Sequence, residues 1–339
     1  MTEPLAQSQP RPRAFSLSSL LRLGAMQRLL AFAGLILLLV VFSLASPNFF
    51  QSYNLIAILT ATTVNGVLAL GVTFVIVTAG IDLSIGTVLT FSAVMTGVLI
   101  TNWHQPILLG IVGGVATGTA AGLVNGVLIA KLKLPPFIAT LGVLNVARGL
   151  ALVFSNLHPI YFSDAPSFNE VAMGSAVSHV LSGFPVPNLV LVLFVSAILA
   201  SLVLSKTSLG RYTFAIGSNE EATRLSGVNV DAWKIAVYGV SGLTAGLGGV
   251  LMAARLNSAQ PALGFGYELE AIAAAVIGGT SLSGGEGTIV GTVIGAFIIS
   301  TLTNGLRILS VPQEWQTVVT GVILILAVYL DIFRRSRRA

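Results

Sequence analysis

Few residues in the sequence could do covalent or metal chemistry, and they are scattered. The 339 residues include three histidines and no cysteine. His104, His158 and His179 lie far apart in the chain, which predicts no clustered metal site, and the lack of cysteine excludes disulfides and thiolate chemistry. No phosphate-binding loop of the form G-x-x-x-x-G-K-[ST] is present, because the glycine-rich stretch Gly284–Gly287 lacks the lysine. We therefore predict no catalytic site, no bound metal or cofactor and no ATP hydrolysis by this chain.

The elements that must position the remaining polar side chains are apolar helices. Hydrophobic residues make up 55% of the chain, charged residues 9%, and the mean hydropathy is +0.92. Soluble domains carry about 25% charged residues, so this composition excludes an ordinary soluble globule, a disordered protein and a nucleic-acid-binding domain. A membrane-crossing helix needs about 20 apolar residues. About ten apolar runs approach that length, at 29–46, 54–79, 84–101, 107–130, 137–155, 188–205, 234–254, 268–280, 288–309 and 315–332.

These runs predict an all-α integral membrane protein with about ten transmembrane helices, of which the eighth, 268–280, is short or broken. The first run could instead be a signal peptide, because Ser43–Ala45 has the small residues of a cleavage site, but its length favours a retained helix. We expect a cytoplasmic arm at 1–28, a single transmembrane domain at 29–332 and a basic cytoplasmic tail at 333–339.

The Lys and Arg residues indicate the orientation of these helices. They concentrate before the first run, after the fourth, between the sixth and seventh, and at the end of the chain, whereas the loop 156–187 has none. Because cytoplasmic loops keep an excess of Lys and Arg, threading ten spans places both termini in the cytoplasm and this loop outside. Arg255 and Arg307 are exceptions near outer helix ends. The pI of about 9.8 therefore indicates topology and contact with anionic headgroups.

Small residues recur at helical spacing in several runs. Small residues let membrane helices approach closely, so these positions predict close helix packing, and sliding of such smooth faces during transport is a second interpretation. The segments 80–86 and 279–285 also agree at four of seven positions, a weak internal echo of the kind found in transporters. The regularly spaced glycines are Gly110, Gly114, Gly118, Gly122 and Gly126, then Gly242 and Gly246, then Gly287, Gly291 and Gly295.

The polar cytoplasmic segment 206–233 is long for a protein so poor in polar residues. Ser218 followed by Glu221 has the spacing of a capping box, which satisfies the free amides of a helix start. Gly227 supplies a left-handed stop. The spacing predicts a short helix over 219–226 beneath the membrane, although a plain connecting loop is the alternative.

Glu221-Ala222-Thr223 with Gly227 resembles the E-A-A-x-x-x-G signature of permease subunits of ATP-binding-cassette (ABC) importers. The segments 77–86, 137–150, 209–230 and 254–296 further resemble the ribose-type sugar permeases, and the resemblance runs from about residue 46 to 332. The family usually has alanine where Glu221 stands, after the acid at Glu220. Which of the two carboxylates has the acidic role of the signature therefore stays open.

The resemblance implies that the short helix is a coupling helix, which docks into a groove of a separate cytoplasmic ATPase that uses ATP. It also implies a second permease, either another copy or a paralogue, an extracytoplasmic sugar-binding protein, and transport of a ribose-like monosaccharide across the bacterial inner membrane. Other small solutes, such as a nucleoside or a branched-chain amino acid, or an ion-coupled secondary transporter, are the alternatives. The residues assigned to ATPase coupling are Ser218, Asn219, Glu220, Glu221, Ala222, Arg224, Leu225 and Gly227.

Polar residues inside the apolar runs are candidates for the transport pathway or for structural pairing. A charge at a helix centre costs about 2.5 to 3.5 kcal/mol on insertion scales, so Arg148 is expected to face the bundle interior or a wet cavity. Asp82 precedes the third run, where capping of the helix is favoured over substrate contact. A local ion network is expected among Arg255, Glu268 and Glu270. The amide candidates, for sugar contact or helix pairing, are Asn65, Asn145 and Asn304, and Asn125 has the same two interpretations.

The outer loop 156–187 mixes aromatic and acidic residues. This composition suits docking of the binding protein that the resemblance implies, with anchoring at the membrane interface as the alternative. The docking candidates are Tyr161, Phe162, Asp164 and Glu170.

Overall fold

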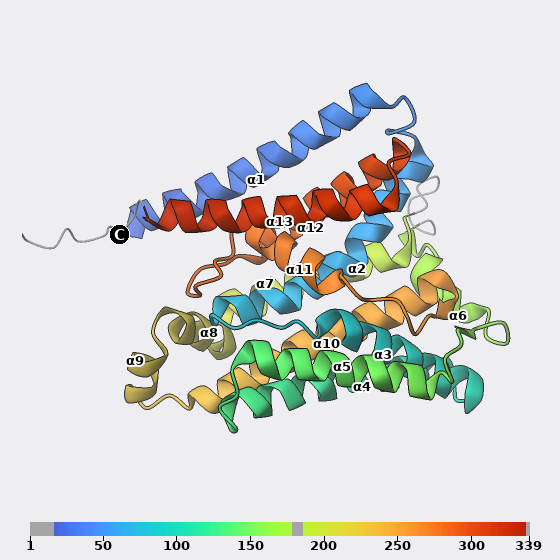
Figure 1. The fold of residues 1–339 in the computed structure, drawn as a ribbon, viewed down its shortest axis with the longest axis horizontal. Helices are drawn as coiled ribbons and strands as arrows, with labels where there is room; N and C mark the ends of the chain where they lie inside the picture. The colour runs from blue at the N-terminus through green and yellow to red at the C-terminus, as the bar shows by residue number, and fades with distance from the viewer. Residues whose placement is uncertain (1–16, 178–185, 337–339) are drawn as a thin grey trace, which may run out of the picture.

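The computed structural model describes residues 17–177 and 186–336, which form a bundle of helices (Figure 1). Residues 1–16 of the expected arm, His179, and residues 337–339 of the expected tail lie outside this part of the chain. The helices are α1 (Leu17–Ala45), α2 (Ser52–Val77), α3 (Ile85–Gly97), the π-helix η1 (Val98–Asn102), α4 (Ile107–Ala130), α5 (Pro136–Phe154), α6 (Ser167–Met173), α7 (Asn188–Lys206), α8 (Ser208–Ser218), α9 (Glu220–Leu225), α10 (Val230–Leu256), α11 (Tyr267–Ile277), α12 (Ile289–Ile308) and α13 (Gln313–Ser336).

The predicted all-helical architecture is confirmed except for a short ladder. Strand β1 (Ile160–Tyr161) pairs antiparallel with β2 (Ser258–Ala259). Within the described residues, seven helices are long and apolar enough to cross a membrane, namely α2, α3 with η1, α4, α5, α7, α10 and α12. Shorter apolar stretches lie in α1 and α13, and α11 has 11 residues. At about 1.5 Å per residue, α11 is shorter than a hydrocarbon core of about 30 Å, as expected for the eighth run.

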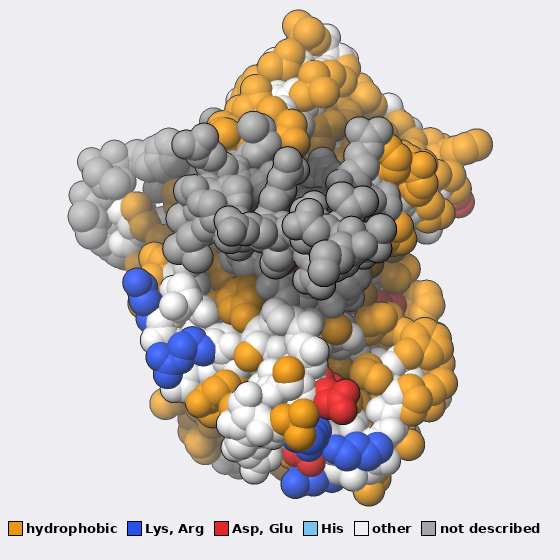
Figure 2. Space-filling view, turned by 90° about the vertical axis from the view of Figure 1, so that its left-hand side faces the viewer, with side chains coloured by type: hydrophobic (Ala, Val, Ile, Leu, Met, Phe, Trp, Pro, Cys, Tyr) orange, Lys and Arg blue, Asp and Glu red, His pale blue; other side chains and the backbone are white. Residues whose placement is uncertain are grey.

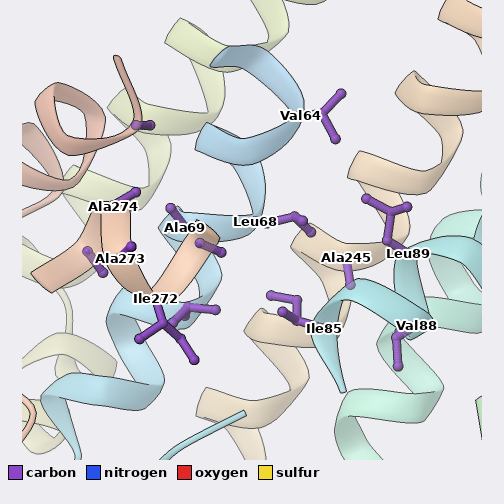
Figure 3. Close-up of a cluster of buried hydrophobic side chains, with 14 of the residues drawn as sticks. Val64, Leu68, Ala69, Ile85, Val88, Leu89, Ala245, Ile272, Ala273 and Ala274 are labelled. Carbon is purple, nitrogen blue, oxygen red and sulfur yellow. The ribbon is translucent and has the colours of Figure 1, made fainter. Parts of the chain in front are cut away.

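The helices form an inner and an outer set. In α2, α3 with η1 and α10, 72% of the most apolar window is buried inside the chain, and in α12 67%, whereas α4, α5 and α7 bury between 22% and 28%. A helix that is apolar on all sides is either buried or faces lipid, and both cases occur here. The inner helices meet in one cluster that includes Leu68 of α2, Ile85 of α3, Ala245 of α10 and Ile272 of α11 (Figure 3).

Glycines bring the backbones of α4 and α10 together. A methyl group built on Gly118 would lie 2.5 Å from the Gly242 carbonyl oxygen and 2.6 Å from the Gly246 Cα. A methyl group on Gly122 would lie 2.8 Å from the Gly242 Cα. The predicted close packing through these small residues is therefore confirmed.

Several loops and short helices lie together at one end of the bundle. The Gly285 amide donates to the Val77 carbonyl at 2.9 Å, so the turn after α11 lies against the end of α2. The echo segments 80–86 and 279–285 follow α2 and α11 from this end, and segment 80–86 leads back into the bundle, where Gly86 lies against Gly264 and Glu268. α8, α9 and the C-terminal end of α13 lie at the same end, and α6 lies at the opposite one (Figure 1).

Candidate coupling segment and translocation pathway

The coupling segment, residues 206–233, contains two helices where the sequence predicted one. α8 packs against the membrane bundle with Gly210, Thr213 and Ile216 buried, and α9 follows after Asn219. These three buried positions recur every third residue, which is the periodic signal that could have revealed α8. The result is an inner helix that supports a short outer one.

The start of α9 differs from the predicted capping box. Ser218 is the last residue of α8, and its hydroxyl donates to the Phe214 carbonyl at 2.9 Å. The Oδ1 atom of Asn219 accepts the Ala222 amide at 2.9 Å, so Asn219 is the cap. The prediction that Ser218 caps this helix was therefore wrong. Serine and asparagine are both good caps, but Ser218 is part of α8, which leaves Asn219 to cap α9. Gly227 has φ +83°, which confirms the left-handed stop.

Charged side chains gather beside α9 on the end of the molecule that Figure 2 shows. The Glu220 carboxylate lies 2.6 Å from the Lys234 Nζ and 3.2 Å from the Arg224 guanidinium. Partial burial by itself raises the pKa of Glu220, but the hydrogen bonds from Lys234 and Arg224 outweigh it, so the pKa lies below its usual range. Glu220 is therefore ionised at neutral pH. These ion pairs define the charge cluster, which consists of Lys131, Lys133, Glu220, Arg224, Asp231 and Lys234.

The two glutamates of α9 have different surroundings. Glu220 is half-buried and bound to α10 through Lys234, whereas Glu221 is exposed. Leu225 has 82% of its side chain exposed. Glu221 and Leu225 are four residues apart and share one face of the helix. The geometry gives Glu220 an internal role and leaves Glu221 and Leu225 for contact with something outside the chain.

Arg148 and Asn145 lie on an open face of α5. Both side chains are exposed, and methyl groups built on Gly142 and Gly149 would meet nothing within 4 Å. The Arg148 guanidinium lies 5.6 Å from the centre of the Phe265 ring, within reach of a cation–π interaction. Of the two surroundings expected for Arg148, the interior of the bundle does not fit its exposed side chain, and a wet cavity stays a prediction. Because charged residues in spans avoid lipid, this face must meet water or another chain.

Asp82 belongs to a buried hydrogen-bond network that joins α3, α4 and α10. Its Oδ1 atom accepts the Ser84 amide at 3.0 Å and the Ser84 hydroxyl at 2.6 Å. Its Oδ2 atom accepts the Ser241 hydroxyl at 2.7 Å, and the Asn125 amide group donates to the Ser84 hydroxyl at 2.8 Å. The residue at the N-cap position of α3 is Ser84, and Asp82 accepts the Ser84 amide and no amide of the first helical turn, so the favoured interpretation of Asp82 as the helix cap is not confirmed. Ser241 was missed, because a serine in an apolar run carries no distinctive spacing.

Besides Asn125, two of the asparagine candidates are buried between helices. Asn65 donates to the Glu270 carboxylate at 2.5 Å and so joins α2 to α11. Asn304 is buried in α12, and its side-chain oxygen has no hydrogen-bond partner in the described part of the chain. Asn145 instead donates to the Leu141 carbonyl of its own helix at 3.0 Å.

The local ion network expected near the outer end of α11 is not formed. Arg255 donates to the Thr60 carbonyl at 3.4 Å, and Glu268 accepts the Gly266 amide at 3.1 Å through both carboxylate oxygens. Arg255 thus contacts a carbonyl inside α2, Glu268 contacts the backbone amide just before α11, and Glu270 accepts a hydrogen bond from the Asn65 side chain.

The outer loop separates into exposed and buried candidates. Tyr161, Asp164 and Glu170 are exposed. Phe162 is fully buried, with its ring centre 4.4 Å from that of Phe168. Phe162 is therefore a core residue of this loop and is not accessible to a docking partner, which corrects the prediction. Across residues 17–177 and 186–336, no group of three His, Cys, Asp or Glu side chains could hold a metal ion.

Comparison with known proteins covers most of the chain. The family described as "Branched-chain amino acid transport system / permease component" matches residues 54–328. The ribose import permease protein RbsC of Bacillus subtilis (strain 168) is 43% identical over 309 residues, which cover 91% of this chain and 94% of that protein. The D-allose transport system permease protein AlsC of Escherichia coli (strain K12) is 39% identical over 298 residues, covering 88% and 89%. The chain belongs to the branched-chain amino acid transport system / permease component family.

Proposed function

We propose that the chain is the membrane-spanning permease subunit of an ABC importer that carries ribose or a related monosaccharide across the bacterial cytoplasmic membrane. Relatives named for ribose import and D-allose transport support this substrate class. The family description names branched-chain amino acids, so such an amino acid is the second candidate substrate. ATP hydrolysis belongs to a separate ATPase chain.

The observation that carries the proposal is the construction of α9. It is a short, capped helix held against α10 by ion pairs, with Glu221 and the 82% exposed Leu225 on one face. A helix fixed in this way transmits a push from a partner, whereas a flexible loop would absorb it. Leu225 would enter an apolar groove of the ATPase, and Glu221 would set the orientation of the contact.

The proposed topology has ten crossings, by α1, α2, α3 with η1, α4, α5, α7, α10, α11, α12 and α13. The charge cluster, α8, α9 and the C-terminal end of α13 lie at one end of the bundle (Figures 1 and 2). The excess of basic side chains at this end supports its placement in the cytoplasm, together with both termini.

The sugar would cross between this permease and a second copy of it. The open face of α5, with Asn145, Arg148 and two uncrowded glycines, supports this location because a polar face in a span needs a wet or protein partner. Movement of α9 on ATP binding would switch this pathway from inward to outward opening. The loaded binding protein would release sugar into it after docking near Tyr161, Asp164 and Glu170.

Reconstitution tests the proposal. The permease is inserted in liposomes with its ATPase and binding protein, and uptake of ribose, allose, galactose, adenosine and leucine is measured. We expect ATP-dependent uptake of a monosaccharide, and loss of uptake without the ATPase. Accumulation driven by a proton or sodium gradient without ATP would contradict the proposal, and selective uptake of leucine would replace the substrate class.

A further inference from the structure

α9 depends on its neighbours for its position. It has six residues, of which Thr223 is buried. Isolated helices of this length are not stable in water, so contacts with the rest of the chain must hold it. Two of these contacts are ion pairs to α10, from Glu220 to Lys234 at 2.6 Å and from Arg224 to Asp231 at 3.0 Å.

Asp231 also contacts a third part of the chain. Its carboxylate lies 2.9 Å from the Lys133 Nζ and 3.8 Å from the Lys131 Nζ. Both lysines belong to the turn between α4 and α5. A single carboxylate at the start of α10 therefore joins the helix proposed to meet the ATPase to the turn that leads into α5.

The turn is rigidly connected to α5. Lys133 has φ +56°, a left-handed conformation that restricts a residue other than glycine. Pro135 and Pro136 follow, and Pro136 is the first residue of α5. A displacement of Lys133 is therefore passed to α5, which carries Asn145 and Arg148 on its open face.

We propose that Asp231 is a positioning residue that transmits movement of α9 to α5 through Arg224 and Lys133. The inference rests on the proposed function and adds how movement at the ATPase contact on α9 would reach the sugar pathway along α5. Exposed ion pairs add little to stability, and Lys133 is 61% exposed in its side chain, so the link acts on position and not on folding. The pair from Glu220 to Lys234 keeps α9 docked on α10 when the link to α5 is removed.

The test uses the complete transporter with Asp231→Asn and measures sugar molecules imported per ATP hydrolysed. We expect this ratio to fall by about fivefold or more, the lower end of coupling between distant sites, with ATPase binding unchanged. Lys133→Gln should also lower the ratio, and the double variant should be no worse than Asp231→Asn, because Asp231→Asn already removes the contact with Lys133 together with those to Arg224 and Lys131. Lys206→Gln, which removes an exposed cation of the same segment outside the cluster, is the matched control and should keep the wild-type ratio.

Three results would overturn the inference. They are a wild-type ratio in both Asp231→Asn and Lys133→Gln, losses that multiply in the double variant, and loss of ATPase binding in Lys133→Gln. If Asp231→Asn is recovered poorly from the membrane, the exposed Lys133 carries the test by itself. Absence of ATP-driven uptake by the wild-type transporter would instead refute the proposed function, on which this inference depends.

Discussion

The contact between α4 and α10 leads to a quantitative prediction for Gly118→Ala. The added methyl carbon would lie 2.5 Å from both the Gly242 carbonyl oxygen and the Gly246 amide nitrogen. Carbon contacts are normally about 3.5 to 4.0 Å, so the helices must separate by about 1 Å. Both obstructing atoms belong to the backbone of α10, so no side-chain rotation can relieve the contact.

The expected cost follows from packing and from helix propensity. An extra methylene in a well-packed interior destabilises by about 1 to 3 kcal/mol, and alanine recovers up to about 1 kcal/mol over glycine in a helix interior. Gly34→Ala in α1 is the matched control, because a methyl group there meets nothing within 4 Å. The propensity gain is common to both variants, so their difference, about 1 to 3 kcal/mol, isolates the packing of α4 on α10.

The assay is thermal unfolding of the purified permease in detergent, followed by tryptophan fluorescence. Gly118→Ala should unfold at a lower temperature than Gly34→Ala, and Gly118→Leu at a lower temperature still. Equal midpoints for the two alanine variants would refute the backbone contact, and with it the close packing of α4 on α10 described above.

Three further predictions concern the coupling segment and the pathway. Leu225→Ala should weaken ATPase binding by about 10- to 150-fold, the loss of about 1.5 to 3 kcal/mol of buried leucine, and unchanged affinity in a binding titration would contradict the docking face. Arg148→Leu should lower sugar uptake about tenfold and leave ATPase binding intact, because it removes a hydrogen bond of about 1.5 kcal/mol from the charged guanidinium to the sugar. Normal uptake in liposomes would show that Arg148 is not part of the pathway. The pKa of Glu220 is lowered from 4.5, so its ion pairs contribute fully above that pH and are lost as pH falls through the lower folded value. Hydrogen-exchange protection of α9, corrected for intrinsic rates, should stay constant from about pH 8 to about pH 5 and fall below that range, and a loss already near pH 6 would show that another group holds α9.

The sequence was informative wherever the membrane limits the possible structures. Each crossing helix needs a long apolar run because the bilayer cannot satisfy exposed backbone groups, and the runs coincide with helices in the structure. The same physics explains why Gly118 and Gly122 could be assigned to close packing, since small residues are the common means of helix contact in lipid. α11 was expected to be short because its apolar run, 268–280, is shorter than the roughly 20 residues that a crossing helix needs.

Sequence reasoning was weaker where a side chain's direction depends on its neighbours. Arg148 was placed from the cost of a charge inside an apolar run, and Phe162 from the composition of its loop. Their outward and inward directions depend on contacts with Phe265 and Phe168, which the sequence pattern does not reveal. Ser218 and Asn219 are adjacent and both suit a helix cap. Only the presence of α8, an amphipathic helix within a polar segment, decides between them.

The distribution of ion pairs explains how a chain with 9% charged residues can be both stable in lipid and responsive to a partner in water. Five ion pairs among the described residues join α9, α10 and the turn before α5. Inside the bundle, Asp82 is held by hydroxyl and amide donors, which avoids the cost of a second buried charge. The two glutamates of α9 also differ in whether they form ion pairs. The Glu220 carboxylate is bound by Lys234 and Arg224, so it cannot contact a partner protein without breaking both ion pairs. It is therefore the carboxylate suited to hold the helix in place. Glu221 has no such constraint, so it is the one whose replacement should alter recognition of the ATPase without moving α9.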